Sequence, residues 1–178
     1  RAAGVDPGDG QDAKARAGPL TGDGPVVHLR EITDDNREQV EALTVSEAQT
    51  DYVEGVTGSL VEAGETPDAA PWFRAVYADD EPVGFVMISD GITVENPDYL
   101  GPYFLWRLLI DQRHQGRGYG AAALRLVVEH VRTRPDAEVL LTSAVPGTHS
   151  PLGFYLRQGF RDTGADHQGE RVLELPLR

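Results

Sequence analysis

The spacing of apolar residues along the chain predicts an alternation of strands and helices. From Gly120 onward, apolar residues recur at positions i, i+3, i+4 and i+7, which predicts one amphipathic helix that ends before Pro135. The stretch from Tyr103 to Ile110 is almost wholly apolar, as in a central strand covered on both faces. Further strands are predicted at residues 26–32, 72–78, 83–89 and 139–144, with two more within 161–177. Further helices are predicted at residues 33–43, 46–64 and 151–158. Gly55 and Gly58 weaken the helix prediction for residues 46–64.

These elements predict a single α/β domain, with a mixed sheet of about six or seven strands flanked by about four helices. A chain of 178 residues has the length of a single domain with one hydrophobic core. Residues 1–25 consist mainly of Ala, Gly, Asp and Pro, with too few apolar side chains to offset the entropy cost of ordering. We therefore expect a disordered N-terminal arm over residues 1–25 and one folded domain over residues 26–178.

Composition narrows the classes of partner. Cysteine is absent, which excludes disulfides and thiolate sites, and the five His residues show no metal-ligand spacing, so we expect no metal. The net charge of -13 disfavours nucleic acid and favours a cationic small molecule, although an Arg-rich, Lys-poor chain is also typical of a generally acidic proteome. No apolar run is long enough for a membrane span and no secretory signal opens the chain, so we expect no membrane partner and a cytoplasmic location.

A glycine-rich loop separates the apolar strand from the long helix. Residues Gln115–Gly120 read Gln-Gly-Arg-Gly-Tyr-Gly. Glycines permit positive φ and close approach of a ligand, and free N–H groups at a helix N-terminus attract an anion. Arg113 and Arg117 can add charge-assisted contacts to phosphate. The pattern therefore predicts a pyrophosphate site.

Other interpretations of this loop were open from spacing alone. The Walker pattern requires Gly-Lys-Ser/Thr, which is absent. Gly116, Gly118 and Ala121 satisfy a relaxed dinucleotide fingerprint, but the following strand ends in residues 141–143 without an acid for a ribose. A loop that only tightens a strand-to-helix turn is also compatible with the spacing.

This loop and a second motif resemble the GNAT superfamily of N-acetyltransferases. Residues Gln115–Gly120 are similar to the superfamily's Gln/Arg-x-x-Gly-x-Gly/Ala signature, and Tyr155 stands four residues before Gly159-Phe160, as in its second hallmark. The likeness runs from about Val26 to Leu177. It extends to the spermine/spermidine-type acetyltransferases in five stretches, namely 47–49 with 52–53, 59–60, 82–87, 106–111, and 163–164 with 169–170.

The resemblance implies acetyl-CoA as the donor and direct transfer to an amine without an acyl-enzyme. It places the backbone of Leu108, Leu109 and Ile110 along the pantetheine arm, and Tyr155 beside the sulfur as the acid for the leaving thiolate. The implied pyrophosphate residues are Gln115, Gly116, Arg117, Gly118, Tyr119, Gly120 and Ala121.

The resemblance also places the segment that contains Glu47 against the acceptor. A carboxylate there can attract an ammonium group and relay its proton, and aromatic side chains can form cation–π contacts with it, although strand aromatics are commonly core. The carboxylate candidates are Glu47, Asp51 and Glu54, with Glu47 as the general base, and the aromatic candidates are Tyr52, Trp72, Tyr103 and Trp106. We expect a small cationic amine, in particular a polyamine. An antibiotic or amino-acid-like amine, and a CoA-binding module without turnover, are the alternatives; a homodimer is compatible with the fold.

Overall fold

Seven β-strands form one mixed sheet, in the order β1-β2-β3-β4-β5-β7-β6. The computed structural model describes residues 24–178, so residues 1–23 of the predicted arm lie outside the described residues. β4 and β5 are parallel, whereas the other neighbouring strands are antiparallel. The strands are β1 Val27–Arg30, β2 Pro71–Ala78, β3 Glu81–Asp90, β4 Tyr103–Ile110, β5 Val139–Ala144, β6 Arg161–His167 and β7 Glu170–Pro176.

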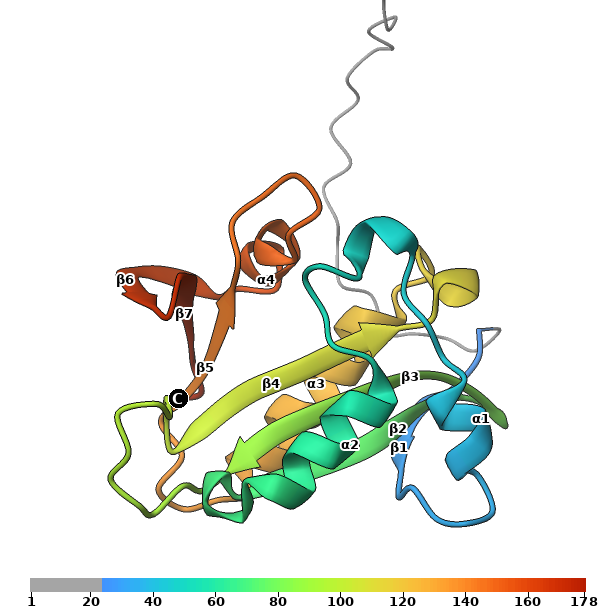
Figure 1. The fold of residues 1–178 in the computed structure, drawn as a ribbon, viewed down its shortest axis with the longest axis horizontal. Helices are drawn as coiled ribbons and strands as arrows, with labels where there is room; N and C mark the ends of the chain where they lie inside the picture. The colour runs from blue at the N-terminus through green and yellow to red at the C-terminus, as the bar shows by residue number, and fades with distance from the viewer. Residues whose placement is uncertain (1–23) are drawn as a thin grey trace, which may run out of the picture.

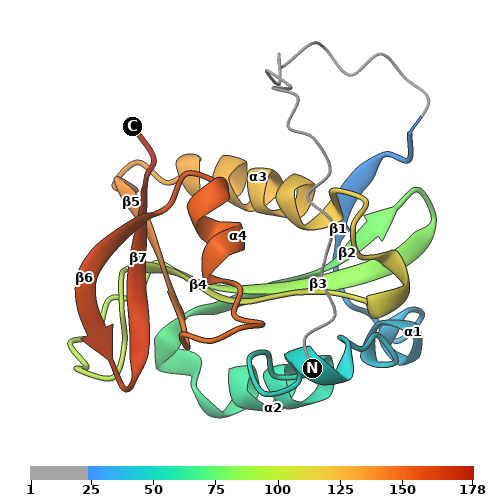
Figure 2. The ribbon, with the colours of Figure 1, turned by 90° about the horizontal axis from the view of Figure 1, so that it is seen from above.

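Helices cover both faces of the sheet, with α3 and α4 on one face and α1 and α2 on the other (Figure 2). The α-helices are α1 Arg37–Glu41, α2 Val56–Glu65, α3 Tyr119–Arg132 and α4 Leu152–Arg157, with short 3-10 helices η1 Glu47–Gln49, η2 Pro67–Ala69 and η3 Gln112–His114. The predicted α/β class is confirmed, with seven strands and four α-helices in the described part of the chain.

Strand β3 separates two hydrophobic cores. Because side chains alternate between the faces of a strand, Val86 and Ile88 pack with residues of α3, whereas Phe85 and Met87 pack with residues of α1 and α2. All four side chains have an exposed fraction of 0%. Burial on both faces explains the continuous apolar run in this part of the sequence.

Two predicted helices differ from their sequence patterns. The helix expected over residues 33–43 begins only at Arg37, because the Asn36 side chain accepts a hydrogen bond from the Thr33 N–H at 2.8 Å and holds a turn before the helix. The next predicted helix is divided into η1 and α2, and Gly55 is the N-cap of α2. The weakening of this helix expected at Gly55 is therefore confirmed.

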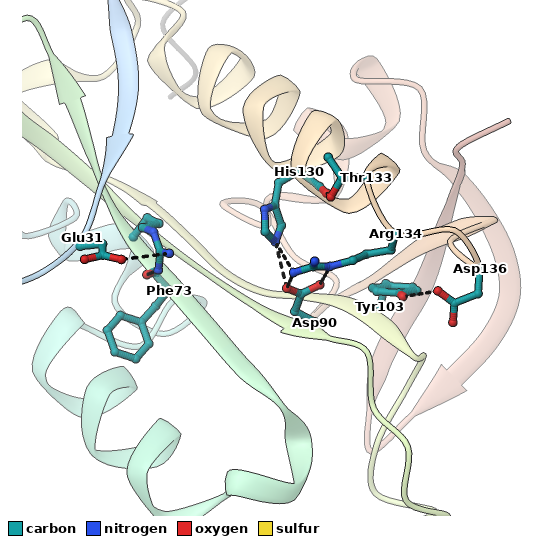
Figure 3. Close-up of polar contacts among 9 residues, drawn as sticks. Glu31, Phe73, Asp90, Tyr103, His130, Thr133, Arg134 and Asp136 are labelled. Atoms are coloured by element: carbon teal, nitrogen blue, oxygen red, sulfur yellow. Dashed lines mark hydrogen bonds and ion pairs between the residues drawn. The ribbon is translucent and has the colours of Figure 1, made fainter.

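A polar network ties the end of α3 to β3 (Figure 3). Asp90 accepts a hydrogen bond from Nε of Arg134 at 3.1 Å, and its Oδ2 lies 2.9 Å from Nε2 of His130. Trp72 stacks on His130 with ring centroids 4.1 Å apart. Burial raises the pKa of Asp90, but the hydrogen bonds from Arg134 and His130 outweigh it and hold that pKa below its usual value.

Asp90 is expected to make folding stability depend on acid pH. Its pKa is lower in the folded chain than in the unfolded chain, where it is about 3.9. The stabilisation is therefore complete above that unfolded value and is lost as the pH falls through the lower folded value. Thermal unfolding of Asp90→Asn should show a loss of about 2 kcal/mol at neutral pH, and the gap from wild type should narrow in acid. A gap of constant size down to pH about 3 would contradict this linkage.

Candidate active site

Strands β4 and β5 diverge, and the opening between them forms the base of the site (Figure 1). The strands pair at only two positions, Phe104 with Leu141 and Leu105 with Thr142. Beyond these pairs, β4 continues to Ile110 without a strand partner on that side. Backbone groups on this edge of β4 can therefore bond to an extended ligand that carries amide groups.

A β-bulge in β4 lies at the start of the opening. Met87 of β3 pairs with Arg107 and Ile88 pairs with Leu105, so Trp106 is the extra residue. A bulge bends a strand and redirects its side chains and backbone groups. The apolar run in the sequence gave no indication of this bulge.

Asp111 fixes the loop between β4 and α3. Its Oδ1 accepts hydrogen bonds from the Arg113 backbone at 3.0 Å and from Nε of Arg113 at 2.8 Å, and its Oδ2 accepts one from the Thr44 N–H at 3.0 Å. Burial raises the pKa of Asp111, but the bonds to Arg113 and Thr44 outweigh it and hold that pKa below its usual value. Arg113, which the sequence offered as a phosphate contact, is therefore engaged by Asp111.

The loop reaches α3 through two glycines with positive φ. Gly116 has φ 76° and Gly118, the N-cap of α3, has φ 81°. In the described part of the chain, the N–H of Ala122 bonds to the Gly118 carbonyl, and the N–H groups of residues 119–121 have no backbone acceptor. A Cβ atom at either glycine would meet no other atom within 4 Å. The start of α3 is therefore an open anion-binding site backed by the helix dipole.

Gln115 connects this loop to the segment before α2. Its Nε2 donates to the Ile110 carbonyl at 2.9 Å and to Oε1 of Gln49 at 2.8 Å. The same Gln49 oxygen accepts a hydrogen bond from the Ser46 N–H at 3.2 Å. The first residue of the glycine-rich motif thus holds η1 beside the end of β4.

Two clefts meet in the opening. The large cleft, of about 860 Å³, follows the loop and the N-terminus of α3, and the small cleft, of about 520 Å³, lies against β4 and the ends of β5 and β7. Both volumes suit small-molecule ligands. The two clefts share six lining residues, which are Val45, Tyr52, Val53, Leu108, Pro151 and Tyr155.

Tyr155 of α4 lies at this junction and is almost fully buried, with an exposed fraction of 6%. Its ring packs between Phe154 and Phe160, each with its centroid 5.4 Å away. Burial raises the pKa of Tyr155 to about 12, and the negative charge of Glu170 adds to this rise. The phenol therefore stays protonated at neutral pH and can donate a proton or a hydrogen bond into the junction.

The small cleft is acidic. It contains the carboxylates of Asp51, Glu54 and Glu170 and one guanidinium, that of Arg107. Arg107 is itself paired with Glu62, with Nη2 and Oε2 2.6 Å apart. Since this pairing offsets the Arg107 charge, the cleft favours a ligand with more than one positive charge.

The structure brings most of the predicted donor residues together. The large cleft is lined by Leu108, Ile110, Gln115, Gly116, Gly118, Tyr119, Gly120, Ala121 and Tyr155. Leu109 instead lines the small cleft, and Arg117 is exposed and lines neither.

The predicted acceptor residues divide into two groups. Asp51, Tyr52 and Trp106 line the small cleft. Glu47 is exposed on η1, and neither Glu47 nor Trp72 is among the residues that line either cleft. Trp72 instead packs between His130 and Arg74, whose guanidinium carbon lies 4.4 Å from the ring centroid. Trp72 therefore packs against α3 through its stacking on His130.

Arg107, Ser143 and Glu170 line the small cleft and were not among the predicted site residues. Arg107 and Glu170 belong to stretches that carry the family resemblance, which was the only signal available for them. Ser143 had none, because its position depends on where β5 leaves β4.

No group of three or more His, Asp or Glu side chains that could hold a metal ion occurs within residues 24–178. None of the helices described for that range has both the length and the apolar character needed to cross a membrane.

This arrangement, a mixed sheet with an opening beside an anion-binding helix N-terminus, defines an acyltransferase fold. The chain belongs to the acetyltransferase (GNAT) family, whose model matches residues 29–160. The chain is 28% identical over 152 residues to a spermine/spermidine N(1)-acetyltransferase of Bacillus subtilis, and the match covers 85% of this chain and 99% of that protein.

Solved structures share the fold. The PaiA N-acetyltransferase of Thermoplasma acidophilum, in complex with coenzyme A, matches with a TM-score of 0.60 and 12% identity over 85% of this chain and 99% of the other. An aminoglycoside acetyltransferase in complex with coenzyme A matches with a TM-score of 0.67 and 15% identity over 85% and 95% of the two chains. The protein is thus an N-acetyltransferase by family, and its relatives in these complexes bind coenzyme A.

Proposed function

We propose that this acetyltransferase moves the acetyl group of acetyl-CoA directly to a primary amine of a polyamine. The observation that carries the proposal is the junction of the two clefts at Leu108 and Tyr155. A donor in the large cleft and an amine in the small cleft meet there, so no acyl-enzyme is needed.

The large cleft fits the donor. The N–H groups at the start of α3 suit the pyrophosphate, and the edge of β4 at Leu108–Ile110, which has no strand partner, suits the pantetheine amides. Bound acetyl-CoA supplies an acetyl thioester. Tyr155 donates its proton towards the sulfur as the thiolate leaves.

The small cleft fits a polyamine. Its carboxylates can hold several ammonium groups along one molecule, and Trp106 and Tyr52 offer aromatic surface for cation–π contact. The similarity to the spermine/spermidine acetyltransferase of Bacillus subtilis supports the same acceptor. Since Glu47 does not line the cleft, we assign the acceptor site to Asp51, Tyr52 and Trp106.

A thiol-release assay with acetyl-CoA tests the acceptor class. The panel consists of spermidine, spermine, an aminoglycoside, several amino acids and a Lys peptide, beside calorimetry of CoA binding. We expect saturable turnover with spermidine or spermine.

The other outcomes of the panel are distinct. Turnover with the aminoglycoside alone would refute a polyamine acceptor and would favour an aminoglycoside instead, the class named for one of the similar structures. Binding of CoA without turnover on any amine would refute the proposed activity and favour a non-catalytic module.

A further inference from the structure

Glu170 is placed where a carboxylate can act on the reacting amine. It is the first residue of β7, and it lines the small cleft together with Tyr155. Its Oε2 accepts a hydrogen bond from Oγ of Ser143 at 2.6 Å. Within residues 24–178, Glu170 forms no ion pair, so its charge is available to a ligand.

The divergence of the strands explains this position. β5 leaves β4 after Thr142, and Ser143 is the next residue on β5. β7 runs antiparallel beside β5, with Val172 opposite Ser143, which places Glu170 at the mouth of the same opening. Two neighbouring strands thus present a hydroxyl and a carboxylate to the small cleft.

The other acids are less well placed. Asp51 and Glu54 line the cleft from an exposed segment, and Glu47 lines neither cleft. Glu170 is partly buried, and its charge contributes to the raised pKa of Tyr155, which places it close to the residue at the junction. Among the three carboxylates that line the small cleft, Glu170 is therefore the one that is both partly buried and held by a side-chain hydrogen bond from another cleft residue.

We propose that Glu170, positioned by Ser143, receives the reacting ammonium group of the acceptor and takes its first proton. This inference rests on the proposed function. An alkylammonium has a pKa of about 10.4, so at neutral pH it must lose a proton before its nitrogen can attack.

Two protons leave the ammonium nitrogen during the proposed transfer. One ammonium proton passes to the Glu170 carboxylate, and the nitrogen lone pair forms the C–N bond as the C–S bond breaks. The sulfur takes a proton from Tyr155, whose phenolate is restored by the second proton that leaves the nitrogen. Glu170 then releases its proton to solvent, so each turnover yields the amide, the free thiol and one proton.

Glu170→Gln tests the assignment, because it removes the charge and keeps an oxygen for Ser143. With spermidine at neutral pH, kcat should fall about 100-fold while CoA binding by calorimetry stays unchanged. The deficit should shrink as the pH rises towards about 10, because the solution then supplies more of the free amine. A purely structural defect would not recover in this way.

Glu174→Gln is the matched control. Glu174 is also partly buried on β7, and it lines neither of the two clefts, so its replacement should leave kcat and the pH profile unchanged. Ser143→Ala, which frees the carboxylate to rotate, should lower kcat by a smaller factor with the same recovery at high pH.

The outcomes separate the two proposals. Wild-type turnover that Glu170→Gln leaves unchanged, or lowers equally at every pH, overturns the role of Glu170 and leaves the polyamine activity standing. Absence of turnover in the wild type on every amine refutes the proposed function and this inference together.

Discussion

Tyr155→Phe is expected to lower kcat by about 100-fold, the lower end of the range for loss of a general acid. Burial raises the pKa of Tyr155 to about 12, so its phenol is protonated throughout the neutral range. Steady-state turnover of spermidine at saturating acetyl-CoA measures the effect.

Tyr103→Phe is the control for this change. Tyr103 is equally a buried tyrosine whose pKa burial raises to about 12, but its hydroxyl bonds to Asp136 and it lines neither cleft. It should lose some stability and keep kcat. Since phenylalanine retains the packing of Tyr155 against Phe154 and Phe160, CoA binding should persist in Tyr155→Phe. An unchanged kcat in that variant would refute proton donation by Tyr155.

Gly118→Val is expected to raise the KM for acetyl-CoA about 10-fold or more. Gly118 has φ 81°, a conformation that costs a branched residue roughly 1 to 3 kcal/mol. A shift of the backbone to relieve this strain turns the N–H groups of α3 away from the phosphate position. Since about 1.4 kcal/mol of binding free energy corresponds to a tenfold change in affinity, a loss of this size accounts for the expected change in KM.

Gly164→Val separates binding from strain. Gly164 on β6 has φ 79°, its added Cβ would also meet no atom within 4 Å, and it lines neither cleft. The two variants should therefore lose similar thermal stability, whereas only Gly118→Val should raise the KM for acetyl-CoA. Equal KM values in the two variants would exclude the start of α3 as the donor site.

Elements with a strong local pattern could be predicted from the sequence. Strand β4 has the predicted bounds Tyr103–Ile110, because a short apolar run that is followed by a glycine-rich loop is typical of a strand covered on both faces. The donor loop could also be predicted, since its glycines and the start of α3 are contiguous in the chain.

The small cleft, which we propose as the acceptor site, could be predicted only in part. It brings together the segment before α2, the bulge at Trp106, the end of β5 and the first residue of β7. Such a site depends on where β4 and β5 diverge, and no local pattern encodes that point. Of the predicted acceptor residues, Asp51, Tyr52 and Trp106 line the small cleft, whereas Glu47 and Trp72 do not. Glu170 had only the family resemblance as a signal, and Ser143 emerged only from the fold.

An initial-rate experiment with acetyl-CoA and spermidine both varied tests most directly whether the acetyl group passes between two substrates that are bound together. Transfer at the junction of the two clefts requires both to be bound together, so the double-reciprocal lines should intersect. Parallel lines, the signature of a covalent acyl-enzyme, would contradict direct transfer.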